Sequence, residues 1–156
     1  MEKLKTAISP DDRGAIAKAL YQCVSETTVT TMLAQNYHWN VTGMAFGPLH
    51  NLFQEIYEGH FAAQDELAER IRALGYFVDG NLTSMVNQSK VTECESQISA
   101  VDMIKNMMNA QETLASTNAG ASDIAASHGD KLTEDLCIER GQVHEKFAWM
   151  LRSHVE

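Results

Sequence analysis

The sequence has few of the residues that interrupt helices or cross-link chains. Its 156 residues include only 2 prolines, 9 glycines and 3 cysteines. So little proline and glycine favours helices, because a sheet would need more β-branched residues and more turn signals. The chain is long enough for one hydrophobic core and short for two domains of usual size. The sequence therefore predicts an all-α fold.

The cysteines suggest neither a disulfide framework nor a zinc cluster. Cys23, Cys94 and Cys137 are odd in number, far apart and without a CxxC pair, so we expect reduced thiols in the core. No apolar run reaches the ~18 residues of a membrane span, and the N-terminus lacks the layout of a signal peptide. We therefore expect no membrane partner and a cytoplasmic location.

Positive charge is also scarce. The chain has 12 Lys and Arg residues against 21 Asp and Glu residues, a net charge of −9. Affinity for a phosphate backbone comes mainly from clustered Lys and Arg, so this balance opposes DNA binding through the general surface. An acidic chain suits cationic ligands better.

The first half of the chain predicts two long helices. Ser9-Pro10-Asp11-Asp12 combines a hydroxyl cap, a proline in the first turn and acids at the positive helix end, so a helix is expected from there to Thr42-Gly43. A second helix is expected to begin at Gly47-Pro48 and to end at Gly75. The stripe predicted for the first helix, at alternating spacings of four and three, is Ile16, Leu20, Cys23, Thr27, Thr30, Ala34, Tyr37 and Val41. The apolar positions predicted for the later helices include Phe61, Val101, Ile124 and Leu132.

The second half predicts two more helices after a long connection. Residues 76–90 are rich in turn formers and should hold one short helix over the side of the bundle. Thr92-Glu93-Cys94-Glu95 fits a capping box that would start the third helix, with a kink at Asn118-Ala119-Gly120. His128-Gly129 should close that helix and Asp130 should begin the fourth.

Together these elements predict a four-helix bundle. Residues 1–8 would form a short N-terminal tail and residues 9–156 a single domain. Bundles of this kind place metal sites between facing helices. The methionines lie mostly at core spacing, so we assign them to packing rather than to a copper site.

An acidic pair on the second helix is a candidate metal ligand. Asp65 and Glu69 point roughly 120° to 160° away from the apolar stripe of that helix. A solvated face is the ordinary explanation for such acids. However, carboxylates four residues apart repel by about 0.2–0.5 kcal/mol unless a positive charge intervenes. A metal ion would supply that charge, and so could Arg70 and Arg72.

Two histidines complete the candidate set. His50 is on the side of the second helix nearest Asp65, but ~22 Å away along an axis that rises ~1.5 Å per residue. If two copies paired this helix antiparallel about a twofold axis, His50 of one copy would approach Asp65 and Glu69 of the other, giving two equivalent sites. His38 lies a short turn before His50 and could join it. Alone, each histidine would be read as a packing or surface residue, but the four residues together predict a site for iron(II), zinc, manganese or cobalt.

Around these residues the sequence resembles the Dps family, the mini-ferritins of the ferritin-like superfamily. The resemblance spans nearly the whole chain, and the spacing of the four candidate ligands matches throughout. The segments that carry it are Tyr37-His38-Trp39-Asn40-Val41-Thr42-Gly43, Phe46, Leu49-His50, Phe53-Gln54-Glu55, Tyr57, Asp65, Ala68-Glu69-Arg70-Ile71-Arg72-Ala73-Leu74-Gly75, Gly129-Asp130, Thr133, Asp135-Leu136, His144-Glu145-Lys146 and Trp149-Met150-Leu151-Arg152.

The resemblance implies a ferritin-like four-helix fold and a hollow dodecamer with ferroxidase centres at its twofold interfaces. His38 and His50 would come from one subunit and Asp65 and Glu69 from its neighbour, and together they would hold two iron ions. The shell would oxidise iron(II), with hydrogen peroxide in preference to oxygen, and store ferric mineral, which protects against oxidative damage. Trp39 could intercept a stray oxidising equivalent near the site, or simply fill the dimer interface.

The resemblance also suggests where iron enters. Acids near the start of the fourth helix line threefold pores in this family, and the candidates here are Asp123, Asp130, Glu134 and Asp135. Helix capping and dipole compensation explain the last three of these acids equally well. Glu55 and Glu58 could nucleate mineral or form a solvated face. Structural or surface roles are expected for His60, His128, His144 and His154.

A rival reading is a nucleoid-associated protein in which iron oxidation is secondary. Many Dps proteins compact DNA through a basic mobile tail, whereas the tail here offers only Lys3 and Lys5. Repeated over twelve subunits, two lysines could still act together, so the prediction is weak or absent DNA binding. A structural bundle with vestigial ligands is a third reading, opposed by the presence of all four candidate ligands.

Overall fold

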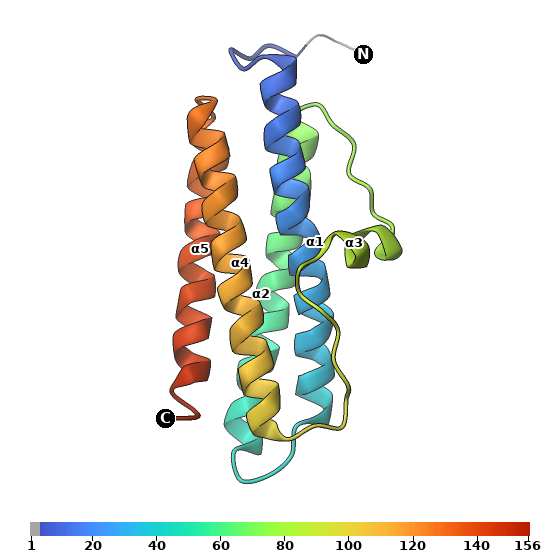
Figure 1. Ribbon diagram of the computed structural model, residues 1–156, viewed down its shortest axis with the longest axis vertical. Helices are drawn as coiled ribbons and strands as arrows, with labels where there is room; N and C mark the ends of the chain where they lie inside the picture. Colours follow the sequence, from blue (N-terminus) through green and yellow to red (C-terminus); the bar gives the residue numbers. More distant parts are fainter. Residues whose placement is uncertain (1–3) are drawn as a thin grey trace.

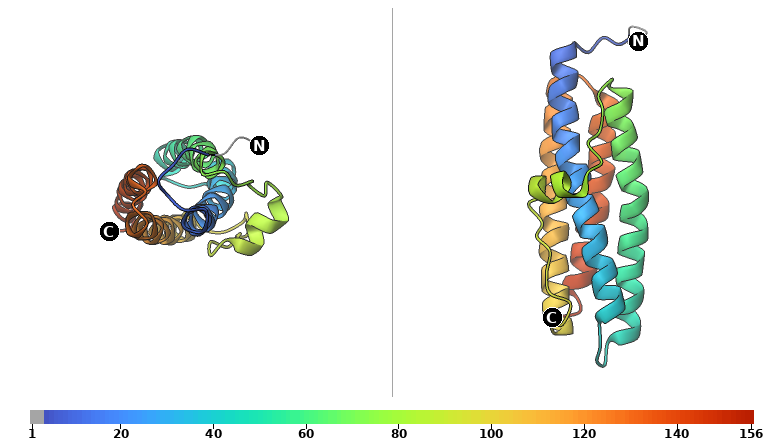
Figure 2. Two further views of the ribbon diagram at one scale, coloured as in Figure 1. Left: turned by 90° about the horizontal axis from the view of Figure 1, so that it is seen from above. Right: turned by 90° about the vertical axis from the view of Figure 1, so that its right-hand side faces the viewer.

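The computed structural model describes residues 4–156, which form five helices and no strands (Figure 1). The helices are α1 (Pro10–Asn40), α2 (Phe46–Ala73), α3 (Leu82–Gln88), α4 (Ala100–Ser127) and α5 (Lys131–Arg152). The four long helices form a bundle, and α3 lies outside it against α1 (Figure 2). The predicted all-α bundle with a short helix in its long connection is confirmed. None of the described helices is long and apolar enough to span a membrane.

The connection between α2 and α4 returns along the length of the bundle, so that these two helices run in the same direction (Figure 1). The pairs α1–α2 and α4–α5 are antiparallel hairpins joined by this crossover. The ends of α1 and α5 are capped as predicted, since Ser9 accepts the N–H of Asp12 and Asp130 accepts the N–H of Thr133.

The predicted start of the third helix at Thr92 is wrong. The helix begins at Ala100, after Ser99, whose Oγ accepts the N–H of Asp102 at 3.1 Å and donates to its carboxylate at 2.6 Å. This cap satisfies an end group of the helix directly, which the residues around Thr92 do not. The helix α4 is continuous through Ser127, so residues 118–120 do not interrupt it, and the kink expected there stays a prediction.

The core consists of two hydrophobic clusters stacked along the bundle. One contains Tyr37, Phe53 and Met107, and the other contains Leu20 and Leu67. The apolar stripe predicted for the first helix is buried throughout: Ile16, Leu20, Cys23, Thr27, Thr30, Ala34, Tyr37 and Val41. Some apolar residues predicted for the other helical stripes are exposed instead, namely Phe61, Val101, Ile124 and Leu132.

Candidate metal centre

The turn between α1 and α2 brings His38 and His50 into contact. Gly43 in this turn has φ +102°, a left-handed conformation that glycine adopts without strain. The two imidazole rings stack with centroids 3.7 Å apart and planes 21° apart. Both side chains are half-buried, so the pair is held by the fold but remains accessible from one side.

Reciprocal hydrogen bonds orient both rings. His38 Nδ1 donates to the backbone carbonyl of His50, and His50 Nδ1 donates to the carbonyl of His38, each at 2.8 Å. A carbonyl oxygen can only accept, so the proton of each neutral imidazole resides on Nδ1. The Nε2 lone pair of each ring is then left free, which is the arrangement of a metal-binding histidine whose other nitrogen is fixed by a backbone carbonyl.

Two aromatic side chains hold this pair from outside. Phe46 stacks on His50 with ring centroids 5.1 Å apart, and Tyr57 packs edge-on against His38 at 5.3 Å. Phe46 and Tyr57 belong to the segments that resemble the Dps family, but their spacing in the sequence does not predict that they pack against the two histidines. Trp39, a secondary candidate for the site, is 61% exposed and makes no ring contact with His38 or His50 among the described residues.

The acidic half of the predicted set lies elsewhere on the same chain. Asp65 and Glu69 are exposed neighbours near the C-terminal part of α2, and Asp65 is ~22 Å along the helix from His50. Within residues 4–156, no three side chains of His, Cys, Asp or Glu come together as a metal site. One chain therefore presents two separate half-sites, an imidazole pair and a carboxylate pair.

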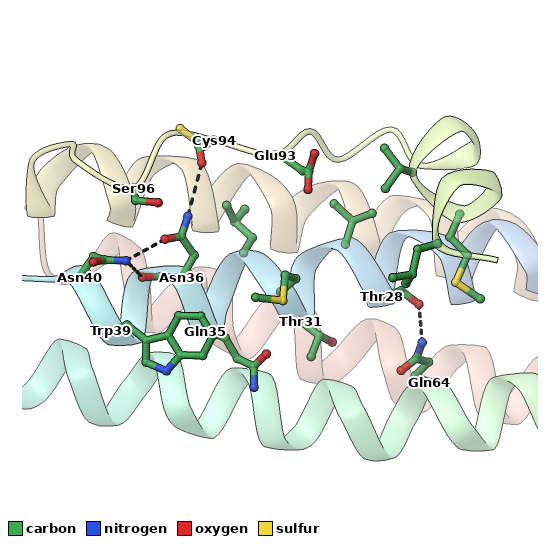
Figure 3. A pocket seen from close by; sticks show the side chains of 16 residues that line it. Thr28, Thr31, Gln35, Asn36, Trp39, Asn40, Gln64, Glu93, Cys94 and Ser96 are labelled. Atoms are coloured by element: carbon green, nitrogen blue, oxygen red, sulfur yellow. Dashed lines mark hydrogen bonds between the residues drawn. The ribbon is translucent and has the colours of Figure 1, made fainter. Parts of the chain in front are cut away.

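A groove of about 660 Å³ lies along α1, lined also by α3, by Gln64 of α2 and by part of the connection that leads to α4 (Figure 3). Its lining reaches from Trp39, next to His38, to Gln64, next to Asp65. Met32 and Leu82 also line it and are 49% and 70% exposed. Large apolar side chains exposed together are typical of a surface that another protein covers.

The predicted pore acids do not share one environment. Asp123 and Asp135 are exposed and Glu134 is half-buried. Asp130 is only 2% exposed, and Arg70 donates to both of its carboxylate oxygens at 2.8 and 3.0 Å. Asp130 also accepts the N–H of Thr133, so it has the helix-capping role that was the alternative explanation for it, and its pore role stays a prediction.

The remaining candidates lie as follows. Glu55 and Glu58 are exposed on α2, and Gln54 donates to Glu58. His128 pairs with Asp12 at 2.8 Å and His154 is exposed, as expected for structural or surface residues. Lys5 is exposed, whereas Lys3 lies outside the described residues.

A buried polar layer lies between the two hydrophobic clusters, and no motif or spacing in the sequence predicts it. Gln111 bridges two fully buried histidines, with Nε2 at 3.1 Å from His60 Nε2 and Oε1 at 2.9 Å from His144 Nδ1. Burial, together with the nearby Arg140 guanidinium, lowers the pKa of His60 to about 3. Burial and the neighbouring His60 and Arg140 lower the pKa of His144 to about 2. Both imidazoles therefore stay neutral at any pH the folded protein ordinarily meets.

This layer predicts a loss of stability in acid. An unfolded imidazole takes up a proton below pH ~6.5, whereas folded His144 does not, so folding stability falls by about 2 kcal/mol per imidazole between pH 6.5 and pH 5. Urea unfolding at both pH values should show about 2 kcal/mol less pH dependence in His144→Gln. The matched change at exposed His154, His154→Gln, should leave the dependence unaltered, and equal slopes in all three proteins would contradict the assignment.

The comparisons with known proteins agree with this architecture. A ferritin-like domain family matches residues 17–156, which defines the class of protein. The DNA protection during starvation protein of Brevibacillus brevis is 31% identical over 143 residues, covering 90% of this chain and 95% of the relative. The crystal structure of Dps from Staphylococcus aureus is 34% identical, with a TM-score of 0.87 over 90% of this chain and 95% of that chain.

A further structure shares the fold at lower identity. The Dps protein of Vibrio cholerae O1, described as a member of a broad superfamily of ferritin-like diiron-carboxylate proteins, has a TM-score of 0.92 at 24% identity and covers 100% of this chain and 99% of that chain. The chain belongs to the Dps family of the ferritin-like superfamily. Membership supports iron storage and ferroxidase chemistry in general terms.

Proposed function

We propose that the protein oxidises iron(II) at sites shared between two subunits and stores the ferric product inside a hollow dodecamer. The observation that carries the proposal is the oriented histidine pair, with both Nδ1 atoms on backbone carbonyls and both Nε2 atoms free. Imidazole and carboxylate donors with open positions suit iron(II). The carboxylates would come from Asp65 and Glu69 of the partner copy.

The stacking of the rings supports two iron ions rather than one. An ion bound by an imidazole lies in the plane of that ring, at about 2.1 Å from the nitrogen. The planes of His38 and His50 are nearly parallel and their centroids are 3.7 Å apart, so they share no position at that distance. Each imidazole would serve its own ion, and the partner's carboxylates could bridge the two.

Two adjacent irons match the electron count of the proposed reaction. Two iron(II) ions give one electron each to one hydrogen peroxide, its O–O bond breaks, and two protons complete two waters. A single iron would deliver one electron and release a hydroxyl radical. The role of the chain is to place both ions within reach of the same oxidant, and that arrangement supplies the protection against oxidative damage.

Pairing about a twofold axis is required because one chain cannot complete a site. An antiparallel arrangement of two α2 helices would bring each histidine pair to the opposite carboxylate pair and generate two equivalent sites. The groove along α1, whose lining includes the exposed apolar residues Met32 and Leu82, supports pairing at this surface. The dodecamer is carried over from the resemblance to Dps proteins, and the proposed location is the cytoplasm, where unpaired cysteines such as those found here are usual.

DNA compaction is not part of the proposal. The Brevibacillus brevis relative is named for DNA protection during starvation, but removal of iron(II) and peroxide protects DNA without contact. The net charge of −9 opposes binding to a phosphate backbone through the general surface.

The first test is a comparison of oxidants. Iron(II) is added anaerobically to the purified protein, followed by hydrogen peroxide or by air, and ferric absorbance is recorded. We expect faster oxidation with peroxide, two iron(II) consumed per peroxide, and less hydroxyl radical trapped than in buffer. Oxidation no faster than in buffer with either oxidant would overturn the proposed function.

A further inference from the structure

One end of the bundle carries a hollow that the proposed iron chemistry does not use. Its volume is about 460 Å³, and its lining combines residues 4–8 of the N-terminal segment with the end of α2 and the start of α5. The N-terminal segment turns over this end of the bundle (Figure 1). Ile8 packs against the core cluster that contains Leu20 and Leu67, which ties the segment to the bundle.

The lining is strongly basic in an otherwise acidic protein. Its positively charged residues are Lys5, Arg13, Arg70 and Lys131, and its one negatively charged residue is Asp130. Asp130 forms an ion pair with Arg70 at 2.8 Å. Lys5, Arg13 and Lys131 form no ion pair with any described residue, so three positive charges face the hollow without a counter-charge.

In the part of the chain that the structure describes, the guanidinium group of Arg13 has no negatively charged partner, and one of its donors has no partner at all. Its Nη1 donates to the neutral backbone carbonyl of Leu74 at 2.9 Å, and its buried Nε–H has no partner. Leaving a charged donor unpaired at a buried position is unfavourable. The first residues of α5 also line the hollow, and the positive end of that helix adds to the attraction for an anion.

We propose that this hollow binds a phosphate group through Lys5, Arg13 and Lys131. Phosphate carries between one and two negative charges near pH 7 and several acceptor oxygens, which suits separate cationic donors arriving from three directions. Inorganic phosphate and the backbone of a nucleic acid share this chemistry. The proposal does not depend on iron oxidation.

Equilibrium dialysis with labelled orthophosphate, at constant ionic strength in sodium chloride, tests the site. The Lys5→Ala, Lys131→Ala double variant should bind phosphate at least about tenfold more weakly than the unaltered protein, because it loses two charged donors. Lys105→Ala, Lys146→Ala removes the same charge from two other exposed positions and should bind as the unaltered protein does. Equal binding by both double variants, or no saturable binding at all, would overturn the proposal.

A gel shift with plasmid DNA at low and moderate salt identifies the source of the phosphate group. If DNA binding is absent while orthophosphate binds, the site serves free phosphate. If DNA binds and only the Lys5→Ala, Lys131→Ala variant loses it, the same site serves the nucleic-acid backbone.

Discussion

Mixing two inactive variants should restore about a quarter of the peroxide-dependent iron oxidation rate if, as proposed, each site is shared by two subunits about a twofold axis. The variants are His38→Ala, His50→Ala and Asp65→Ala, Glu69→Ala. Alone, each should lose at least about 100-fold in rate, since changes that merely misorient metal ligands already reduce function by about 10–100-fold. In a mixed dimer, one site lacks both pairs of ligands and the other keeps both pairs. Random pairing makes about half of the dimers mixed, so about a quarter of all sites are intact.

The measurement uses differently tagged variants that are unfolded together, reassembled and purified through both tags. Glu139→Ala, Glu145→Ala removes two exposed carboxylates from α5 and should keep the full rate, which controls for loss of negative charge. Mixed assemblies that form but remain inactive would show that the half-sites do not combine across subunits. Full activity of Asp65→Ala, Glu69→Ala would show that the acidic ligands are misassigned.

Asp130→Ala should destabilise the protein by about 3 kcal/mol, the low end for a buried ion pair, because Asp130 is buried while Arg70 is 20% exposed and loses its counter-charge. Asp130 accepts both hydrogen bonds from Arg70 and also caps α5 through the N–H of Thr133. Urea unfolding at fixed protein concentration measures the effect. The exposed acid Asp135 provides the control, since Asp135→Ala should change stability by no more than about 0.5 kcal/mol.

The pH dependence of this interaction has a definite sign. Burial raises the pKa of Asp130, but hydrogen bonds from Thr133 and Arg70 outweigh burial and hold the pKa below its ordinary value. The stabilisation is therefore present at neutral pH and disappears as the pH falls through the lowered pKa. Asp130→Asn keeps a capping oxygen and should lose less than Asp130→Ala. Equal stability of Asp130→Ala and the unaltered protein at pH 7 would refute the assignment.

Local chemistry made much of the fold predictable. Ser9-Pro10 and His128-Gly129-Asp130 marked helix ends because caps, proline and glycine act within a few residues. The predicted helix start at Thr92 was wrong because a capping-box pattern is compatible with a helix start but does not require one. Ser99 and Asp102 form the actual cap a few residues later. The apolar pattern of the second helix predicts that Phe61 is buried, yet it is 69% exposed, because spacing alone does not show which edge of an apolar stripe the neighbouring helices cover.

The candidate metal centre was predictable as a set of residues but not as a geometry. The spacing of His38, His50, Asp65 and Glu69 named the candidate ligands, and the distance along α2 predicts that two copies are needed to bring them together. Sequence could not show the reciprocal carbonyl bonds or the rings of Phe46 and Tyr57, because these depend on how the turn after α1 closes. It also missed the layer of His60, Gln111 and His144, whose members lie on three helices and meet only after folding.

The reciprocal bonds between His38 and His50 imply an order of events. Both rings are anchored to carbonyls of their own chain, so a subunit that has just folded already displays the nitrogen donors in their final orientation. In the proposed assembly, the partner's carboxylates would then complete a set of donors whose imidazoles are already oriented, and iron(II) would bind last. A newly folded subunit and an assembled shell would differ in the residues that surround the imidazoles, but the orientation of the two rings would be the same in both.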